Sequence, residues 1–159
     1  MIANIAASTI DEYCAVLDLL EGEDGVDCYE INVSCPNVKE GGLNFGTSCP
    51  MTSEITKRLR SRTKRPLIIK LTPNVTHISE FARAAEDAGA DAVSVMNTLI
   101  GMAINARTRK PVLSTVTGGL SGPAVKPVAL AKVYETARAV KIPVIGIGGI
   151  TNGTDAIEF

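Results

Sequence analysis

The sequence predicts an α/β fold built on a parallel sheet. Short apolar runs rich in β-branched residues alternate with longer segments of helical periodicity, which is typical of repeated βαβ units. Most of the apolar runs are continuous, as expected for strands that are buried on both faces of a sheet. We expect residues 1–159 to form a single domain.

Five strands and four helices are predicted in alternation. The expected strands are residues 2–6, 28–33, 67–71, 92–96 and 143–147. The expected helices are residues 8–21 with a Ser or Thr cap, 50–62, 78–88 ending at Gly89, and 124–140 with Pro127 in the first turn. The connections 34–48 and 97–122 are longer than the roughly two to six residues of a usual βα loop, so each is expected to cover or line a site.

Composition and charge argue against several classes of function. The 16 basic residues are scattered among 17 acidic ones, and the basic cluster at 57–65 fits a solvated helix surface, so no nucleic-acid site is expected. No apolar run reaches the ~18 residues of a membrane span and no signal sequence is present, which predicts a cytoplasmic protein. The spacing of the cysteines predicts neither a metal site nor a disulfide framework. They are Cys14, Cys28, Cys35 and Cys49.

Polar side chains follow the second predicted strand, where ligands bind in parallel α/β folds. Asn32 and Asn37 flank Cys35. Amides suit a planar ligand with carbonyl and N–H groups, and a thiol of tuned pKa could act as a general base. A turn in which Asn and Pro simply end the strand explains these residues equally well.

The next two strands also end in candidate binding residues. Lys70 closes an apolar run, and a lysine there is costly unless an anion such as a reduced flavin ring neutralises it. A lysine that extends to the rim of the fold is the alternative. Asn97 and Thr98 follow the fourth strand and would face the same opening, although such a pair often forms a turn.

Two glycine clusters, at 118–122 and 146–149, supply the candidate phosphate contacts Gly122, Gly148 and Gly149. Glycine lets backbone N–H groups approach a phosphate, but a tight turn explains each cluster alone. The third glycine of a dinucleotide fingerprint is missing. The clusters and the Asn and Lys sites together favour a mononucleotide cofactor. His77 is interpreted as a surface or capping residue.

These motifs resemble those of class 1 dihydroorotate dehydrogenases. The similar stretches are residues 30–39 with 41–42 and 45–47, then 70–74, 97–102, 118–123 and 146–150. The resemblance implies a (β/α)8 TIM barrel of the FMN-dependent oxidoreductase type. The chain would then be an incomplete portion, about strands three to seven, and inactive on its own. Residues 48–51 depart from the sequence pattern of this family, and this difference is expected to alter the cap of the second helix.

The resemblance also implies roles for individual residues. Cys35 would remove the proton from C5 of dihydroorotate while the C6 hydride passes to FMN, which yields orotate in de novo pyrimidine biosynthesis. Asn32, Asn37, Asn97 and Thr98 would bind the substrate. Lys70 would lie beside the flavin ring, and the backbone of Gly122, Gly148 and Gly149 would contact FMN, chiefly its phosphate.

The resemblance favours one subclass and leaves alternatives open. A cysteine base separates class 1 from the membrane-associated class 2, which uses serine. Residues 38–47 and 97–102 resemble the NAD-linked 1B type, which implies a homodimer and an electron-transfer subunit with FAD and an iron-sulfur cluster. The alternatives are an FMN domain of the dihydropyrimidine dehydrogenase kind, where histidine is expected in place of Asn37, and an inactive barrel fragment.

Overall fold

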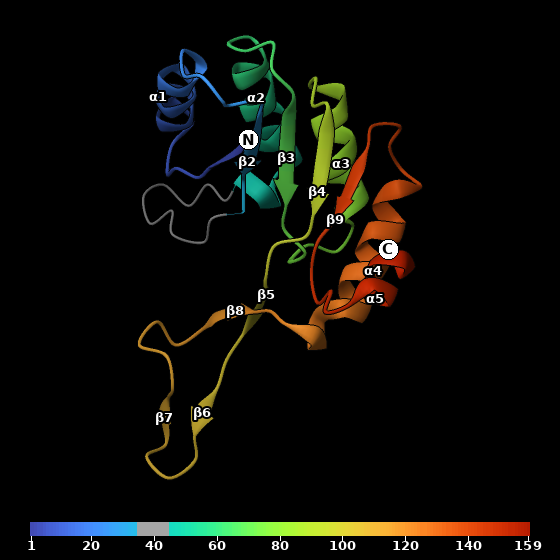
Figure 1. Ribbon diagram of the computed structural model, residues 1–159. Coiled ribbons are helices and arrows are strands. Elements are labelled where there is room, and N and C mark those ends of the chain that lie inside the picture. The colour runs from blue at the N-terminus through green and yellow to red at the C-terminus, as the bar shows by residue number, and fades with distance from the viewer. Residues whose placement is uncertain (35–44) are drawn as a thin grey trace.

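A five-stranded parallel sheet organises the computed structural model, which describes residues 1–34 and 45–159 (Figure 1). Its strand order is β1-β2-β3-β4-β9, so each crossover connects neighbouring strands. These strands are β1 (Ile2–Ile5), β2 (Cys28–Asn32), β3 (Leu67–Leu71), β4 (Ala92–Val95) and β9 (Val144–Gly146). The predicted α/β class, the parallel sheet and its five strands are therefore confirmed.

The four predicted helices are present, and they lie on one side of the sheet (Figure 1). α1 begins with a capping box, because Oγ1 of Thr9 accepts the Glu12 N–H and the Glu12 carboxylate accepts the Thr9 N–H. The 3-10 turn η2 (Pro123–Val125) replaces the predicted start of α4, and a fifth helix was not predicted. The helices are α1 (Ile10–Glu21), α2 (Cys49–Arg60), α3 (Ile78–Asp87), α4 (Lys126–Ala137) and α5 (Gly153–Glu158).

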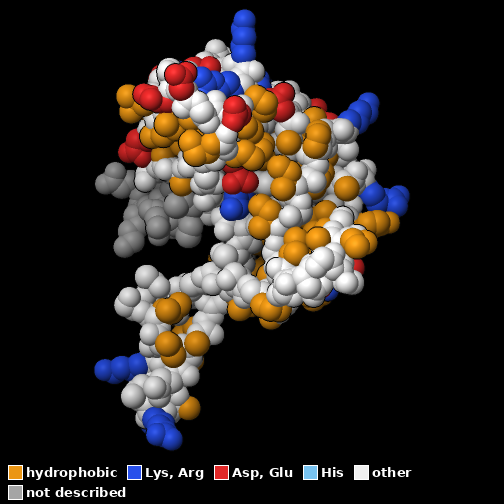
Figure 2. All heavy atoms as spheres, viewed as in Figure 1, with side chains coloured by type: hydrophobic (Ala, Val, Ile, Leu, Met, Phe, Trp, Pro, Cys, Tyr) orange, Lys and Arg blue, Asp and Glu red, His pale blue; other side chains and the backbone are white. Residues whose placement is uncertain are grey.

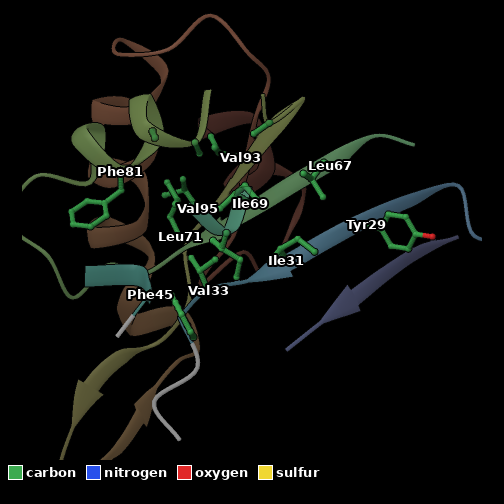
Figure 3. Close-up of a cluster of buried hydrophobic side chains, with 14 of the residues drawn as sticks. Tyr29, Ile31, Val33, Phe45, Leu67, Ile69, Leu71, Phe81, Val93 and Val95 are labelled. Carbon is green, nitrogen blue, oxygen red and sulfur yellow. The ribbon is translucent and has the colours of Figure 1, made fainter. Parts of the chain in front are cut away.

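The main core lies between the sheet and these helices. In the three central strands, β2, β3 and β4, alternate residues point to opposite faces, and the helix-facing set is fully buried (Figure 3). A 3-10 turn, η1 (Phe45–Thr47), adds Phe45, whose ring meets the edge of the Tyr13 ring with centroids 6.0 Å apart. The helix-facing strand residues include Tyr29, Ile31, Leu67, Ile69, Leu71, Val93 and Val95.

The opposite face of the sheet has no helix over it within residues 1–34 and 45–159. Hydrophobic side chains gather on this face (Figure 2), and at its edges Ile2 is 57% exposed and Ile145 39% exposed. A polar row crosses its middle, where Glu30 accepts hydrogen bonds from Asn4 Nδ2 (2.5 Å) and Ser94 Oγ (2.7 Å). Because parallel sheets are normally covered on both faces, this face lacks the cover that such a sheet requires.

Residues 97–122, predicted as a loop that covers or lines a site, contain a hairpin arm instead. β5 (Leu99–Gly101) pairs antiparallel with β8 (Gly118–Leu120), and β6 (Ile104–Asn105) pairs with β7 (Lys110–Pro111). The arm projects away from the carboxyl edge of the sheet (Figure 1). Only its root therefore contributes to the site. Its exposed apolar residues are Ile100, Met102, Ile104, Val112, Leu113, Val116 and Leu120.

The arginines of α2 and its flank form ion pairs, as expected for a solvated surface. Arg58 pairs with Asp11 at 2.7 Å and Arg62 with Asp18 at 2.6 Å, which ties α2 to α1. Ser48, at the N-cap of α2, makes no side-chain capping bond, and Pro50 lies in the first turn of this helix. In the described ranges, no helix is long and apolar enough to cross a membrane, and no cluster of potential metal ligands occurs.

Candidate functional site

The polar residues predicted at the ends of β2, β3 and β4 meet at the carboxyl edge of the sheet. Asn32 and Lys70 are register partners on β2 and β3, and Lys70 is also the partner of Ser94 on β4. Asn97 lies two residues after the last residue of β4, and its backbone N–H donates to the Leu71 carbonyl at 3.1 Å. The structure thus brings Asn32, Lys70 and the Asn97-Thr98 pair together from three neighbouring strands.

A hydrogen-bond network orients the two asparagine amides. Asn97 Nδ2 and the Ser34 N–H both donate to Asn32 Oδ1, at 3.1 and 3.2 Å. The acceptor of Asn32 is therefore occupied, while its Nδ2 has no acceptor among the described residues. The Oδ1 of Asn97 accepts the Thr98 N–H at 2.8 Å. Because both side-chain carbonyls are used internally, the pair presents N–H donors, which suit the carbonyl and carboxylate oxygens of a ligand.

A cavity of about 150 Å³ lies beside these amides. It is small compared with the ~300 to 1,000 Å³ of typical ligand sites, so it is only part of such a site. The half-buried Lys70 ammonium forms no ion pair with any described residue, and a cation in this position favours an anionic ligand. The lining residues are Lys70, Met96, Asn97, Thr98, Leu120, Ser121, Val125, Ile147 and Gly148.

The three candidate glycines all have positive φ, and only Gly148 lines the cavity. At Gly149, with φ of 77°, an added Cβ would lie 2.7 Å from the backbone nitrogen of Lys126. Glycine is thus required there by the close approach to the first turn of α4. Gly122 has φ of 88° with open space around it, so its backbone conformation alone favours glycine. The geometry supports the tight-turn interpretation and leaves phosphate contact as a prediction.

Asp155 fixes the segment that follows these glycines, and the sequence analysis missed it. Its carboxylate accepts hydrogen bonds from Lys126 Nζ (2.6 Å) and from the backbone N–H (2.8 Å) and Oγ1 (2.7 Å) of Thr151. The Lys126 ammonium and the Thr151 donors hold the pKa of this carboxyl well below its usual range. The signal in the sequence was Asn152 three residues ahead, since Asn152 Oδ1 caps α5 by accepting the Asp155 N–H.

Asn74 was noted only as part of a motif, yet its side chain reaches the same region. Its Nδ2 donates to the Thr98 carbonyl at 2.9 Å, and its Oδ1 accepts the Ile100 N–H at 3.0 Å. It is not among the residues that line the cavity. A Pro-Asn pair just after a buried strand was the available signal, because Asn bonds readily to nearby backbone.

Two predicted site residues, Cys35 and Asn37, lie outside the described residues. Burial raises the pKa of the Cys28 and Cys49 thiols, which makes both of them poor bases near neutral pH. His77 is exposed at the N-cap position of α3, where its side chain makes no capping bond. The prediction that it is a surface residue is confirmed.

Comparison with known proteins assigns the chain to a family. The model of the family described as "Dihydroorotate dehydrogenase" matches residues 1–159. The chain belongs to the dihydroorotate dehydrogenase family. The predicted family resemblance is thereby confirmed, and the parallel α/β sheet of the structure is consistent with the FMN-dependent barrel fold expected of that family.

Several dihydroorotate dehydrogenases are similar over the whole chain. The protein named "Dihydroorotate dehydrogenase B (NAD(+)), catalytic subunit" is 56% identical over 159 residues in Alkaliphilus oremlandii and 54% identical in Bacteroides thetaiotaomicron. The protein of the same name in Desulforamulus reducens is 55% identical. Each match covers 100% of this chain and 52% of the relative. The chain therefore spans about half the length of these curated relatives.

Proposed function

We propose that the full-length protein containing this chain oxidises dihydroorotate to orotate in de novo pyrimidine biosynthesis. The observation that carries the proposal is the convergence of Asn32, Asn97 and Lys70, which has no ion-pair partner among the described residues, at the carboxyl edge of the sheet. Dihydroorotate carries ring carbonyls and a carboxylate, all of which accept hydrogen bonds. An amide pair that presents N–H donors matches these groups.

FMN is the proposed cofactor, and the residues present fit it. The Lys70 ammonium would lie beside the end of the flavin ring that becomes anionic on reduction. The backbone of Gly122, Gly148 and Gly149 would lie near the phosphate, because all three have positive φ and Gly149 lies against the backbone nitrogen of Lys126 at the start of α4. When bound, FMN supplies the hydride acceptor that no side chain can provide.

The chain's own residues would orient the substrate and take up one proton. Asn32, Asn37, Asn97 and Thr98 would hold the pyrimidine ring in a fixed plane, which aligns its reacting carbons. The thiolate of Cys35 would take the C5 proton and become a thiol, while the C6 hydrogen leaves as a hydride. Breaking these two C–H bonds forms the C5=C6 double bond of orotate.

We assign the five strands to about strands three to seven of a (β/α)8 barrel. The uncovered sheet face supports this assignment, since Ile2 and Ile145 are exposed at its two edges. The remaining strands would close the barrel against β1 and β9, cover this face and enlarge the cavity. The site would then be shared between this chain and the strands beyond it.

The full-length protein is further proposed to be NAD-linked and to work as a homodimer. Its electron-transfer subunit would carry FAD and an iron-sulfur cluster. The relatives' names, which specify NAD(+) and a catalytic subunit, support this part of the proposal. The exposed apolar side chains of the arm are compatible with a subunit interface.

A product assay with two substrates tests the proposed function. The purified full-length protein is supplied with dihydroorotate or with dihydrouracil and an artificial electron acceptor, and the products are separated. We expect orotate from dihydroorotate and little uracil from dihydrouracil. Preferential formation of uracil would instead assign the protein a dihydropyrimidine dehydrogenase activity. The absence of product from both substrates would contradict the proposed function.

A further inference from the structure

The side-chain amide of Asn74 pairs with the segment that leads from the site into the arm. Its Nδ2 donates to the Thr98 carbonyl at 2.9 Å and its Oδ1 accepts the Ile100 N–H at 3.0 Å. These are the carbonyl of one residue and the N–H of the second residue after it. A residue on a parallel neighbouring strand would bond the same two backbone groups. The Asn74 amide therefore takes the place of such a strand beside residues 98–100.

Asn74 is itself held at the end of β3. Oγ1 of Thr72 accepts hydrogen bonds from the Asn74 backbone N–H and from its Nδ2, both at 3.2 Å. Thr72 is buried and directly follows the last residue of β3. The orientation of the amide is therefore set by the sheet.

The segment that Asn74 holds carries the candidate substrate contacts. The Thr98 N–H donates to Asn97 Oδ1, and Asn97 Nδ2 donates to Asn32 Oδ1. A continuous series of hydrogen bonds thus runs from Asn74 through the Thr98 backbone to both site asparagines. Asn74 acts from outside the cavity, because it is not among the lining residues.

The arm offers little of its own to fix this segment. Ile100 is 68% exposed and Met102 52% exposed, and the arm is a two-stranded hairpin that projects from the body (Figure 1). Such hairpins are marginally stable without further packing. Pairing between β5 and β8 and the two Asn74 bonds are therefore the main restraints described at the arm's root.

We infer that Asn74 is a positioning residue that sets the placement of Asn97 and Thr98 for substrate binding. The inference rests on the proposed function of the site. Asn74 touches neither the cavity nor the reacting atoms, so its loss acts on the affinity for the pyrimidine. The rate of hydride transfer from correctly bound substrate is preserved.

The test compares Asn74→Ala and Asn74→Asp with the control Asn105→Ala in the full-length protein. Asn105 also accepts backbone N–H groups, from Arg107 and Thr108, but at the tip of the arm. Asn74→Ala should weaken orotate binding, followed by its effect on the flavin spectrum, about tenfold, as expected for the loss of one or two hydrogen bonds. The KM for dihydroorotate should rise similarly, with kcat within about twofold of wild type and Asn105→Ala unchanged.

A second readout does not depend on activity. Backbone amide hydrogen exchange across residues 98–101 should be faster in Asn74→Ala than in wild type or Asn105→Ala. If the wild type neither binds orotate nor oxidises dihydroorotate, the proposed function fails, and faster exchange would still support the positioning role.

Unchanged exchange or unchanged orotate affinity in a folded Asn74→Ala protein would overturn the inference. If that variant does not fold, Asn74→Asp, which keeps the acceptor for Ile100, decides by the same criteria.

Discussion

Asn97 donates through Nδ2 to Oδ1 of Asn32 across 3.1 Å and so joins the ends of β4 and β2 over the intervening strand β3. The bond occupies Oδ1 of Asn32 together with the Ser34 N–H, while Asn32 Nδ2 has no acceptor among the described residues. Two residues that are 65 positions apart are thereby held together in one hydrogen-bond network.

Asn97→Ala should impair substrate binding more than catalysis. The change removes one amide and leaves Asn32 Oδ1 with the Ser34 N–H as its remaining donor, so the oriented donor pair is lost. We expect the KM for dihydroorotate to rise about tenfold or more while the FMN content stays at the wild-type level. Steady-state kinetics and flavin absorbance of the full-length protein check this. An unchanged KM would show that Asn97 does not bind the substrate.

Lys70→Ala should weaken FMN binding or slow flavin reduction. The change removes the half-buried cation that lines the cavity without an ion-pair partner among the described residues. Stabilisation of the anionic reduced ring depends on such a charge. The control is Lys64→Ala, at an exposed lysine away from the cavity. If both variants keep wild-type FMN affinity and reduction rates, Lys70 is only a lysine at the rim of the fold.

Cys35→Ser should severely lower dihydroorotate oxidation at neutral pH and leave FMN bound. A serine hydroxyl does not ionise near neutrality, so it is a far poorer base than a thiol. Cys49→Ser is the matched control, because burial raises the pKa of the Cys49 thiol and leaves it unsuited to the role. Near wild-type turnover of Cys35→Ser would show that another group takes the proton.

Asp155→Asn should lower the melting temperature at neutral pH. The folded-state pKa of Asp155 is depressed by Lys126 and Thr151, so its stabilising effect is present above its unfolded pKa of about 3.9. That effect is lost as the pH falls toward the depressed folded-state value. The difference in melting temperature between wild type and Asp155→Asn should therefore shrink below about pH 4.

The exposed Asp87 supplies the control for this experiment. Asp87→Asn should leave the melting temperature nearly unchanged across the same pH range. An Asp155→Asn protein as stable as wild type at pH 7 would contradict the assigned role of the Asp155 carboxylate.

The sheet was predictable because its strands follow simple local rules. The run Leu67–Leu71 is apolar except for Lys70 and follows Pro66, and its predicted ends match the structure. The arm was missed because its strands are only two or three residues long and its apolar residues, such as Ile104, are exposed. Periodicity detects burial, so it gives no signal for a hairpin whose apolar residues are mostly exposed.

The convergence of three candidate site residues was predictable from the sequence, but the hydrogen bonds and contacts around them were not. The ends of parallel strands share one edge, which is why Asn32, Lys70 and Asn97 could be placed together from their positions alone. The bonds of Asn74 to Thr98 and Ile100 depend on where the chain turns after Asn97, and no local pattern specifies that turn. Gly149 shows the same limit, since its contact with Lys126 is tertiary.

Anaerobic mixing of the FMN-loaded full-length protein with dihydroorotate tests the proposed oxidation at the flavin itself. We predict rapid bleaching of the flavin by dihydroorotate and not by dihydrouracil, with one orotate formed per flavin reduced. Residues 1–159 alone should be colourless, because the uncovered sheet face and small cavity leave the cofactor site incomplete. A flavin that dihydroorotate leaves oxidised, in a protein that retains FMN, would contradict the assignment.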